Sequence, residues 1–200
     1  MGDSVDQARF IGIDASLTST GIAFINKNGK IESFTIKPKD KRAGPRLDYI
    51  YHTTLEFLQD NVDIGAICCM EGYSYGSAGR VFEIAEGAGV IKLALAQHGI
   101  IPVIVAPSQL KKFSTGKGMW PKAVAKLKVW EAANNLNIAE TIPAKEFDRS
   151  DSTVLCRIAQ VIGTKEMLTI RASLEVIHEL LVGKKQVKKK STKLRTPTTL

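Results

Sequence analysis

Residues 12–24 read GIDASLTSTGIAF, and this stretch decides what kind of sheet the chain can form. The apolar runs on both sides have the length and composition of strands, so residues 8–14 and 20–26 are predicted to be neighbouring strands. A short turn rich in hydroxyl side chains lies between them, and Asp14 stands where the first run ends. A carboxylate that closes a buried strand needs a partner, because burying an unpaired charge is costly.

Further strand and helix patterns follow in an order typical of α/β proteins. The Asn-Lys-Asn-Gly sequence at 26–29 predicts a tight turn into a third strand at 30–36. Two later apolar runs, at 64–71 and 101–107, have the composition of buried strands and alternate with helical patterns. Helices are predicted at 47–61, 81–99, 122–136, 148–163 and 166–181. We expect an α/β fold with a mixed five-stranded sheet, three antiparallel strands followed by parallel strands, flanked by helices.

The positive charge of the chain is concentrated at its C-terminal end. The net charge of the 200 residues is +8, and residues 184–200 contain seven basic residues and no acidic one. About one positive charge is left for residues 1–183, so we expect a globular domain at 1–183 and a basic, disordered tail at 184–200. The chain has no apolar run of about 18 residues, which argues against a membrane span. Its three cysteines form neither a disulfide framework nor a Cys-x-x-Cys pair, which indicates a reducing compartment such as the cytosol.

Four carboxylates stand where a purely structural role is weak. Asp14 and Glu71 each end a predicted strand, and Asp148 and Asp151 lie three apart at the start of a predicted helix, on one face. Ligands of α/β sheets bind at the ends of adjacent central strands, so these side chains are expected to meet there. Clustered carboxylates repel one another, and such oxygen donors suit Mg²⁺ or Mn²⁺, with two ions about 4 Å apart for phosphodiester hydrolysis. The simpler alternatives are a turn role for Asp14 and a helix N-cap role for Asp148 or Ser150.

Four motifs in order along the chain resemble those of RuvC-type Holliday-junction resolvases, which belong to the RNase H-like nuclease superfamily. They are GIDASLTSTGIAF, CCMEGYSY, VAPSQLKKFSTGKGMWPK and FDRSDSTVLC, and the resemblance extends from Arg9 to about Gly163. It implies that Asp14, Glu71, Asp148 and Asp151 bind the metals, with Asp14 touching both ions. The first motif of the family often has Pro-Gly after its Asp, where this chain has Ala15-Ser16. The last motif usually has Ala where Ser152 stands, so the departures indicate a divergent member of viral or phage origin.

The resemblance also implies an activity and an assembly. The expected enzyme is a metal-dependent, structure-selective endodeoxyribonuclease that cuts four-way DNA junctions in the cytosol of a bacterium or a phage-infected host. Two symmetric cuts suit a homodimer. In the family the long helix corresponding to residues 81–99 lies at the dimer interface, which would give Gly87 and Gly89 a close-packing partner.

A lysine-rich segment and two tyrosines are predicted to contact DNA. Six lysines and no acidic residue lie between Ile100 and Trp130, and lysines beside a metal site suit DNA phosphates. The resemblance implies phosphate contacts for Lys111 and Lys122, and the loop sequence adds Lys112 and Lys117. The tyrosines that follow Glu71 are candidates for stacking on an unpaired base, or else pack on the sheet edge; they are Tyr73 and Tyr75.

Other functions fit single features of the sequence. A flap, branch or RNA–DNA hybrid nuclease would share the same carboxylates, since such proteins read backbone shape. The Asp-x₅-Thr-Gly pattern at 14–21 also fits an actin-like or sugar-kinase-like ATP-binding protein, but 200 residues are too few for the two domains these proteins need. The sequence around Gly116 and Lys117 lacks the spacing of a phosphate loop, so no nucleotide cofactor is expected. A non-catalytic DNA-binding protein would lack one of the four carboxylates, and none is missing.

Overall fold

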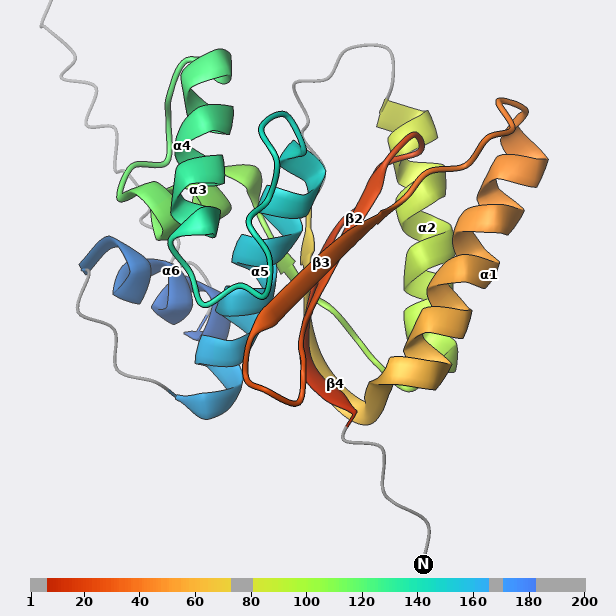
Figure 1. Cartoon of the computed structure of the whole chain (residues 1–200), viewed down its shortest axis with the longest axis horizontal. Coiled ribbons are helices and arrows are strands. Elements are labelled where there is room, and N and C mark those ends of the chain that lie inside the picture. Colours follow the sequence, from red (N-terminus) through yellow and green to blue (C-terminus); the bar gives the residue numbers. More distant parts are fainter. Residues whose placement is uncertain (1–6, 73–80, 166–170, 183–200) are drawn as a thin grey trace, which may run out of the picture.

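A mixed five-stranded sheet forms the centre of the molecule (Figure 1). The computed structural model describes residues 7–72, 81–165 and 171–182. The strands are β1 (Ala8–Asp14), β2 (Thr20–Ile25), β3 (Ile31–Ile36), β4 (Val62–Glu71) and β5 (Val103–Val105), in the spatial order β3-β2-β1-β4-β5. The first three strands pair antiparallel, whereas β4 is parallel to β1 and β5 is parallel to β4. The predicted fold class is therefore confirmed.

The turn between β2 and β3 shows why the first three strands form a meander. The side-chain oxygen of Asn26 accepts hydrogen bonds from the backbone N–H groups of Asn28 at 2.9 Å and Lys30 at 3.0 Å. Gly29 has a φ of 71°, a conformation that glycine adopts without strain. This turn fixes the register of β2 against β3, and β2 in turn places Gly21 opposite Asp14 of β1.

Helices cover both faces of the sheet (Figure 1). One face packs against α1 (Ala43–Asn61) and α2 (Val81–Gln97), and the largest group of buried apolar residues lies there. The other face packs against α5 (Phe147–Thr164), which carries a second core together with α3 (Pro107–Thr115), α4 (Lys122–Asn134) and α6 (Arg171–Val182). The strong hydrophobic periodicity of α5 explains this position, since its buried side chains fall on one face.

One helix was absent from the sequence-based prediction. The segment that follows β5 was expected to be a loop as far as residue 121, but its first half is helix α3. Pro107 lies in its first turn, the side chain of Gln109 accepts from the N–H of Ala106 at 2.9 Å, and Gly116 ends it with a left-handed φ of 77°. Of the glycines and lysines that suggested a loop, Gly116, Lys117 and Gly118 lie at and beyond the helix end, whereas Lys111 and Lys112 are on the helix itself.

Smaller differences concern strand and helix limits. Helix α1 begins at Ala43, four residues before its predicted start. Strand β5 has only three residues and lies at the sheet edge, and Ile104 is 46% exposed, so the expectation of a buried strand at 101–107 is wrong. Tyr73, Tyr75 and the basic tail at 184–200 lie outside the described residues. Among the helices of the described part, none is long and apolar enough to cross a membrane.

Candidate active site

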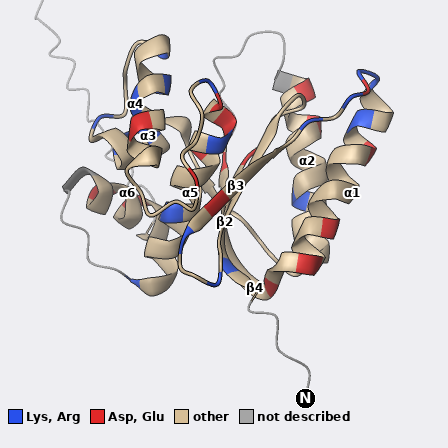
Figure 2. Ribbon diagram, viewed as in Figure 1, with Lys and Arg blue, Asp and Glu red and all other residues tan. Residues whose placement is uncertain are grey.

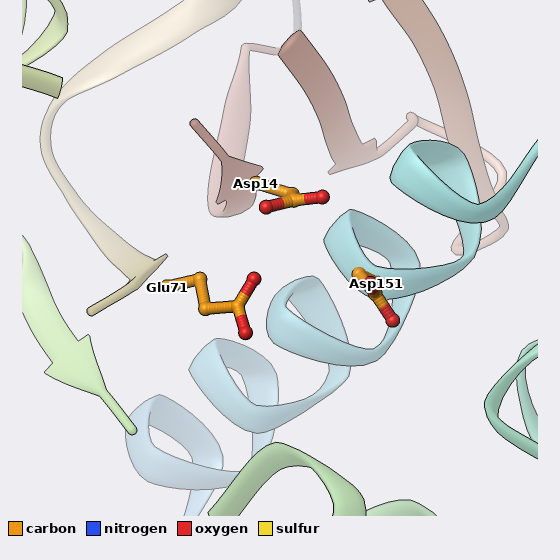
Figure 3. Close-up of side chains that lie close together, drawn as sticks. All are labelled: Asp14, Glu71 and Asp151. Atoms are coloured by element: carbon orange, nitrogen blue, oxygen red, sulfur yellow. The ribbon is translucent and has the colours of Figure 1, made fainter. Parts of the chain in front are cut away.

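Three of the four predicted carboxylates meet at one end of the sheet (Figure 3). Asp14 ends β1, Glu71 ends β4, and Asp151 projects from the first turns of α5. One carboxylate oxygen of each lies within 4.8 Å of the other two. Because β1 and β4 are parallel neighbours with Ile13 beside Met70, their next residues reach the same edge of the sheet.

Glycines in the strands bring α5 close enough to complete this cluster. A Cβ atom on Gly12 would lie 2.1 Å from the backbone oxygen of Ser152, and one on Gly21 would lie 2.1 Å from the backbone oxygen of Asp148. Both distances are far below van der Waals contact, so only glycine lets the helix backbone rest on β1 and β2. These two glycines were not predicted to have a role. The signal was present, since glycine inside a strand marks a close backbone approach.

Burial and mutual repulsion raise the pKa values of the three clustered carboxyl groups. Burial is the main cause that raises the pKa of Asp14 well above its usual range, with the charges of Glu71 and Asp151 adding to it. Burial, followed by the charges of Glu71 and Asp148, raises the pKa of Asp151 to about 8. The pKa of Glu71 is also raised by burial, although a hydrogen bond with Asp14 and the charge of Lys111 oppose the rise. The hydrogen bond between Asp14 and Glu71 raises the pKa of Asp14 and lowers that of Glu71, so Asp14 is the donor of this pair when it carries the proton.

Asp148 lies at the edge of the cluster. It is in the first turn of α5, and its negative charge contributes to the raised pKa values of Asp14, Glu71 and Asp151. It is not part of the described group whose oxygens all lie within 4.8 Å. The alternative that Asp148 or Ser150 caps the helix is wrong, because the N-cap position is occupied by Glu146 and both residues lie inside the helix. An acidic residue in the first turn is also favoured by the helix dipole.

Two lysines lie near the carboxylates from α3 and α4. Lys111 lowers the pKa of both Glu71 and Asp151 through its charge, and Lys126 acts on Asp151 in the same way. The ammonium of Lys126 lies over the ring of Phe147, 4.9 Å from its centroid, which holds the side chain at the start of α5. Lys126 belongs to the lysine-rich segment recognised in the sequence, but it was not predicted to act at the site.

The other lysines of the segment have different surroundings. Lys112, which was also predicted to contact DNA, forms an ion pair through its ammonium with Glu175 of α6 at 2.6 Å. Lys117 lies over the ring of Trp120, 4.7 Å from the centroid, on the segment between α3 and α4. Lys122 is exposed at the first position of α4. The predicted DNA contacts of Lys111, Lys112, Lys117 and Lys122 remain predictions.

The hydroxyl-rich turn after Asp14 is held by its own side chains. Thr20 donates a hydrogen bond to the carbonyl of Ser16 at 2.6 Å and accepts one from its N–H at 3.2 Å. Leu17 at the tip packs against α2, where a Cβ on Gly87 would be 3.0 Å from the Leu17 side chain. The close partner expected for Gly87 from a second subunit is therefore wrong, because Leu17 of the same chain occupies that place. Gly89 is exposed, and a Cβ atom added to it would meet none of the described residues within 4 Å.

The order of the strands, with carboxylates at the ends of β1 and β4, is that of an RNase H-like fold. Among solved structures, the chain is similar to a Thermus thermophilus RuvC structure, with a TM-score of 0.57 and 17% identity over 73% of this chain and 89% of that one. It is similar to T. thermophilus RuvC in complex with a Holliday junction substrate, with a TM-score of 0.57 and 19% identity over 74% and 90%. The sequence profile of crossover junction endodeoxyribonuclease RuvC matches residues 10–153. The chain therefore belongs to the RuvC family of Holliday-junction resolvases, as its motifs predicted.

Proposed function

We propose that this chain is a metal-dependent endonuclease that hydrolyses phosphodiester bonds at four-way DNA junctions. The observation that carries the proposal is the meeting of Asp14, Glu71 and Asp151 from three separate elements within 4.8 Å. Membership of the RuvC family supports the reaction class. The T. thermophilus relative in complex with a Holliday junction substrate supports the choice of substrate.

The donor set fits Mg²⁺ or Mn²⁺. All three side chains offer carboxylate oxygens, which hard divalent cations prefer, and Asp148 at the edge of the cluster is available as a fourth. The pKa values of Asp14 and Asp151 are raised because burial and like charges favour the protonated carboxyls. A divalent cation would replace these protons. When bound, two such ions would supply a water activated for attack and stabilisation of the leaving oxygen.

The protein's own residues position the DNA and the carboxylates. Strands β1 and β4 hold Asp14 and Glu71 on a rigid sheet, and the close packing of α5 on Gly12 and Gly21 fixes Asp151. Lys111 and Lys126 bring positive charge to the edge of the cluster, where a DNA phosphate would approach. Lys117 and Lys122 extend this surface along the segment between α3 and α4, in keeping with the predicted DNA contacts.

A homodimer would supply the two symmetric cuts that a four-way junction requires. Helix α2 offers a surface for it, since Phe82 is 85% exposed and Leu93 is 52% exposed. Glu86 and Gly89 lie on the same helical stripe, at spacings of three and four residues. We expect Leu93→Glu to give a single-chain mass by light scattering and to uncouple the two cuts. A wild-type protein that has the mass of one chain with and without junction DNA would contradict the dimer.

The proposed compartment follows from the cysteines. Cys68, Cys69 and Cys156 are all buried and free, and burial raises the pKa of each thiol. Such cysteines are packing residues and suit a reducing compartment. We therefore place the enzyme in the cytosol of a bacterium or of a phage-infected host.

The test is a cleavage panel with purified protein. Four-way junction, flap, fork, linear duplex and RNA–DNA hybrid substrates are incubated with Mg²⁺, with Mn²⁺ or with a chelator. We expect paired cuts in the junction with either metal and none with the chelator. Asp14→Asn should remove cleavage while leaving junction binding measurable, so its cutting at the wild-type rate would refute the metal-site assignment. Cleavage of flaps or hybrids alone would refute the junction specificity and keep the nuclease.

A further inference from the structure

A cavity with both polar and apolar lining residues lies beside the turn that follows Asp14, against the first turns of α1 and α2. These two helices cover the face of the sheet opposite α3 and α4 (Figure 1). The cavity has a volume of about 440 Å³ and lies between the hydroxyl-rich turn after β1, the segment 37–42 after β3 and the first turns of α1 and α2. We call it the turn cavity. Its polar lining includes the side chains of Ser16, Thr18, Lys39, Lys41 and Arg46.

The lining of the turn cavity has an excess of positive charge. Residues 37–46 contain five basic residues and one acidic residue, and Figure 2 shows the basic positions along this segment and at the start of α1. The acidic residue, Asp40, is bound by Arg42, whose guanidinium lies 2.6 Å from it and holds the pKa of that carboxyl below its usual value. Glu83 of α2 is the other acidic residue of the lining. The cations of Lys39 and Lys41 have no carboxylate partner among the described residues.

Arg46 supplies a donor that the described part of the protein does not use. Its terminal amine donates to the backbone carbonyl of Lys41, which anchors the guanidinium at the end of the 37–42 segment. Its Nε is buried and has no hydrogen-bond partner among the described residues. A buried donor without an acceptor is unfavourable. An oxyanion in the turn cavity would be met by the guanidinium of Arg46, which lines the cavity, and by the hydroxyl groups of Ser16 and Thr18.

The position of the turn cavity indicates which oxyanion it receives. Ser16 and Thr18 lie two and four residues after Asp14 in the chain, so the cavity begins close to the carboxylate cluster. The lysines of α3 and α4 lie on the other side of the sheet (Figure 1). A DNA strand with one phosphate at the cluster would therefore meet positive charge on both sides, as successive phosphates of one strand do in a basic groove.

We propose that the turn cavity binds a backbone phosphate of the DNA strand that is cut, through Arg46, Lys39, Lys41 and the hydroxyls of the turn. The proposal rests on the proposed nuclease function and adds a second phosphate site to it. It predicts that the strand is held on both sides of the reacting phosphate, which restricts how it lies over the carboxylates.

Binding measurements separate this site from the cluster. All variants are made in the Asp14→Asn protein, so that junction DNA binds without being cut. We expect Lys39→Gln/Lys41→Gln to raise the Kd several-fold and to lower the slope of log Kd against log salt by about one for each lost phosphate contact. Arg46→Lys keeps the charge but replaces the planar guanidinium and its several donors by a single ammonium, and we expect it to weaken binding as well. The matched control is Lys27→Gln/Lys30→Gln, two exposed lysines in the turn at the other end of β2.

A scan of the DNA locates the phosphate. Single neutral methylphosphonates are placed at successive positions around the cut site of the junction. One of these methylphosphonates should weaken junction binding by the Asp14→Asn protein. The same methylphosphonate should not weaken binding further in Lys39→Gln/Lys41→Gln, since the shared contact is already lost. A Kd and salt slope equal to those of the control variant would refute the proposal. The proposal would also be refuted if a cavity variant left the Kd for junction DNA unchanged and altered only the binding of inorganic phosphate, because the cavity would then bind free phosphate rather than DNA.

The two proposals fail in different ways. A wild-type protein that binds junctions but cuts none of the substrates with Mg²⁺ or Mn²⁺ refutes the proposed function, while the methylphosphonate scan still reports on the turn cavity. A protein that cuts junctions, and whose cavity variants bind like the control, refutes only the phosphate site.

Discussion

The substitution Gly21→Ala tests whether the approach of α5 to the sheet creates the active site. The added Cβ would lie 2.1 Å from the backbone oxygen of Asp148 and 2.6 Å from its carbonyl carbon. An ordinary contact begins near 3.4 Å, so the first turn of α5 must retreat by more than 1 Å. Overpacking of this kind costs about 1–3 kcal/mol. Alanine also fits a strand better than glycine by roughly 0.5–1 kcal/mol, which offsets part of that cost.

The catalytic effect should exceed the effect on stability. Asp148 and Asp151 both lie on the part of α5 that must move, so the cluster loses its geometry while the protein stays folded. A misplacement of about 1 Å can reduce a rate by about 100-fold. We expect Gly21→Ala to cleave junctions about 100-fold more slowly than wild type, measured at saturating DNA and metal and well below its melting temperature. Circular dichroism and a thermal melt show whether the fold is kept.

The control for this experiment is Gly44→Ala. Gly44 lies in the first turn of α1 without a left-handed φ, and none of the described residues lies within 4 Å of its added Cβ. Alanine there should leave cleavage unchanged and raise stability slightly, since alanine is the better helix former. A Gly21→Ala protein that cleaves within twofold of wild type would show that the position of α5 against β2 does not determine the site.

Three further predictions concern charge. The pKa of Asp151 in the folded protein is about 8, against 3.8 for an ordinary aspartate, so between these values the folded state binds more protons than the unfolded state. The free energy of unfolding of the metal-free protein, and with it the melting temperature, should therefore fall as pH rises from about 5 to 8. The fall should be up to about 1.4 kcal/mol per pH unit for each proton that the folded state retains. Asp151→Asn should make this fall smaller. An equal fall in Asp151→Asn would contradict the assignment. Mg²⁺ added at pH 8 should release protons and raise the melting temperature, measured by calorimetry in two buffers of different ionisation enthalpy. Lys111→Met should slow cleavage, because Lys111 brings positive charge to the carboxylate cluster. Lys112→Met at the next position should cost only about 0–1 kcal/mol of stability, because Lys112 forms a surface ion pair with Glu175. An equal loss of cleavage in both variants would show that the two lysines have the same role.

Local patterns were enough to predict most of the fold. Alternating apolar runs and the turn at 26–29 predicted the three-stranded meander, and β1 has the limits that the sequence suggested, Ala8–Asp14. Helix α3 was missed because its short length and its terminal Gly116 look like a loop when only composition is read. Strand β5 was overestimated because a run of apolar residues does not show whether both faces will be covered.

The candidate site also has residues that could be predicted from the sequence and residues that could not. Asp14 and Glu71 were predictable, since strand ends in a parallel pair meet at one edge of the sheet. The partner of Lys112 was not predictable, because Glu175 lies 63 residues away in the chain and reaches α3 only through the packing of α6. The contact between Gly87 and Leu17 was likewise a matter of tertiary packing, and the sequence suggested a second subunit instead.

The order of residues along the chain is enough to show where the carboxylates stand: one at the strand end at 14, another at the strand end at 71 and a pair at the start of a late helix. These choices are local, because strand ends and helix starts can be recognised from neighbouring residues. The packing of the folded chain, by contrast, makes Asp151 complete the cluster with Asp14 and Glu71 while Asp148 stays at its edge. That outcome depends on how far the backbone of α5 can approach β1 and β2, and the glycines that allow it act through contacts more than 100 residues away.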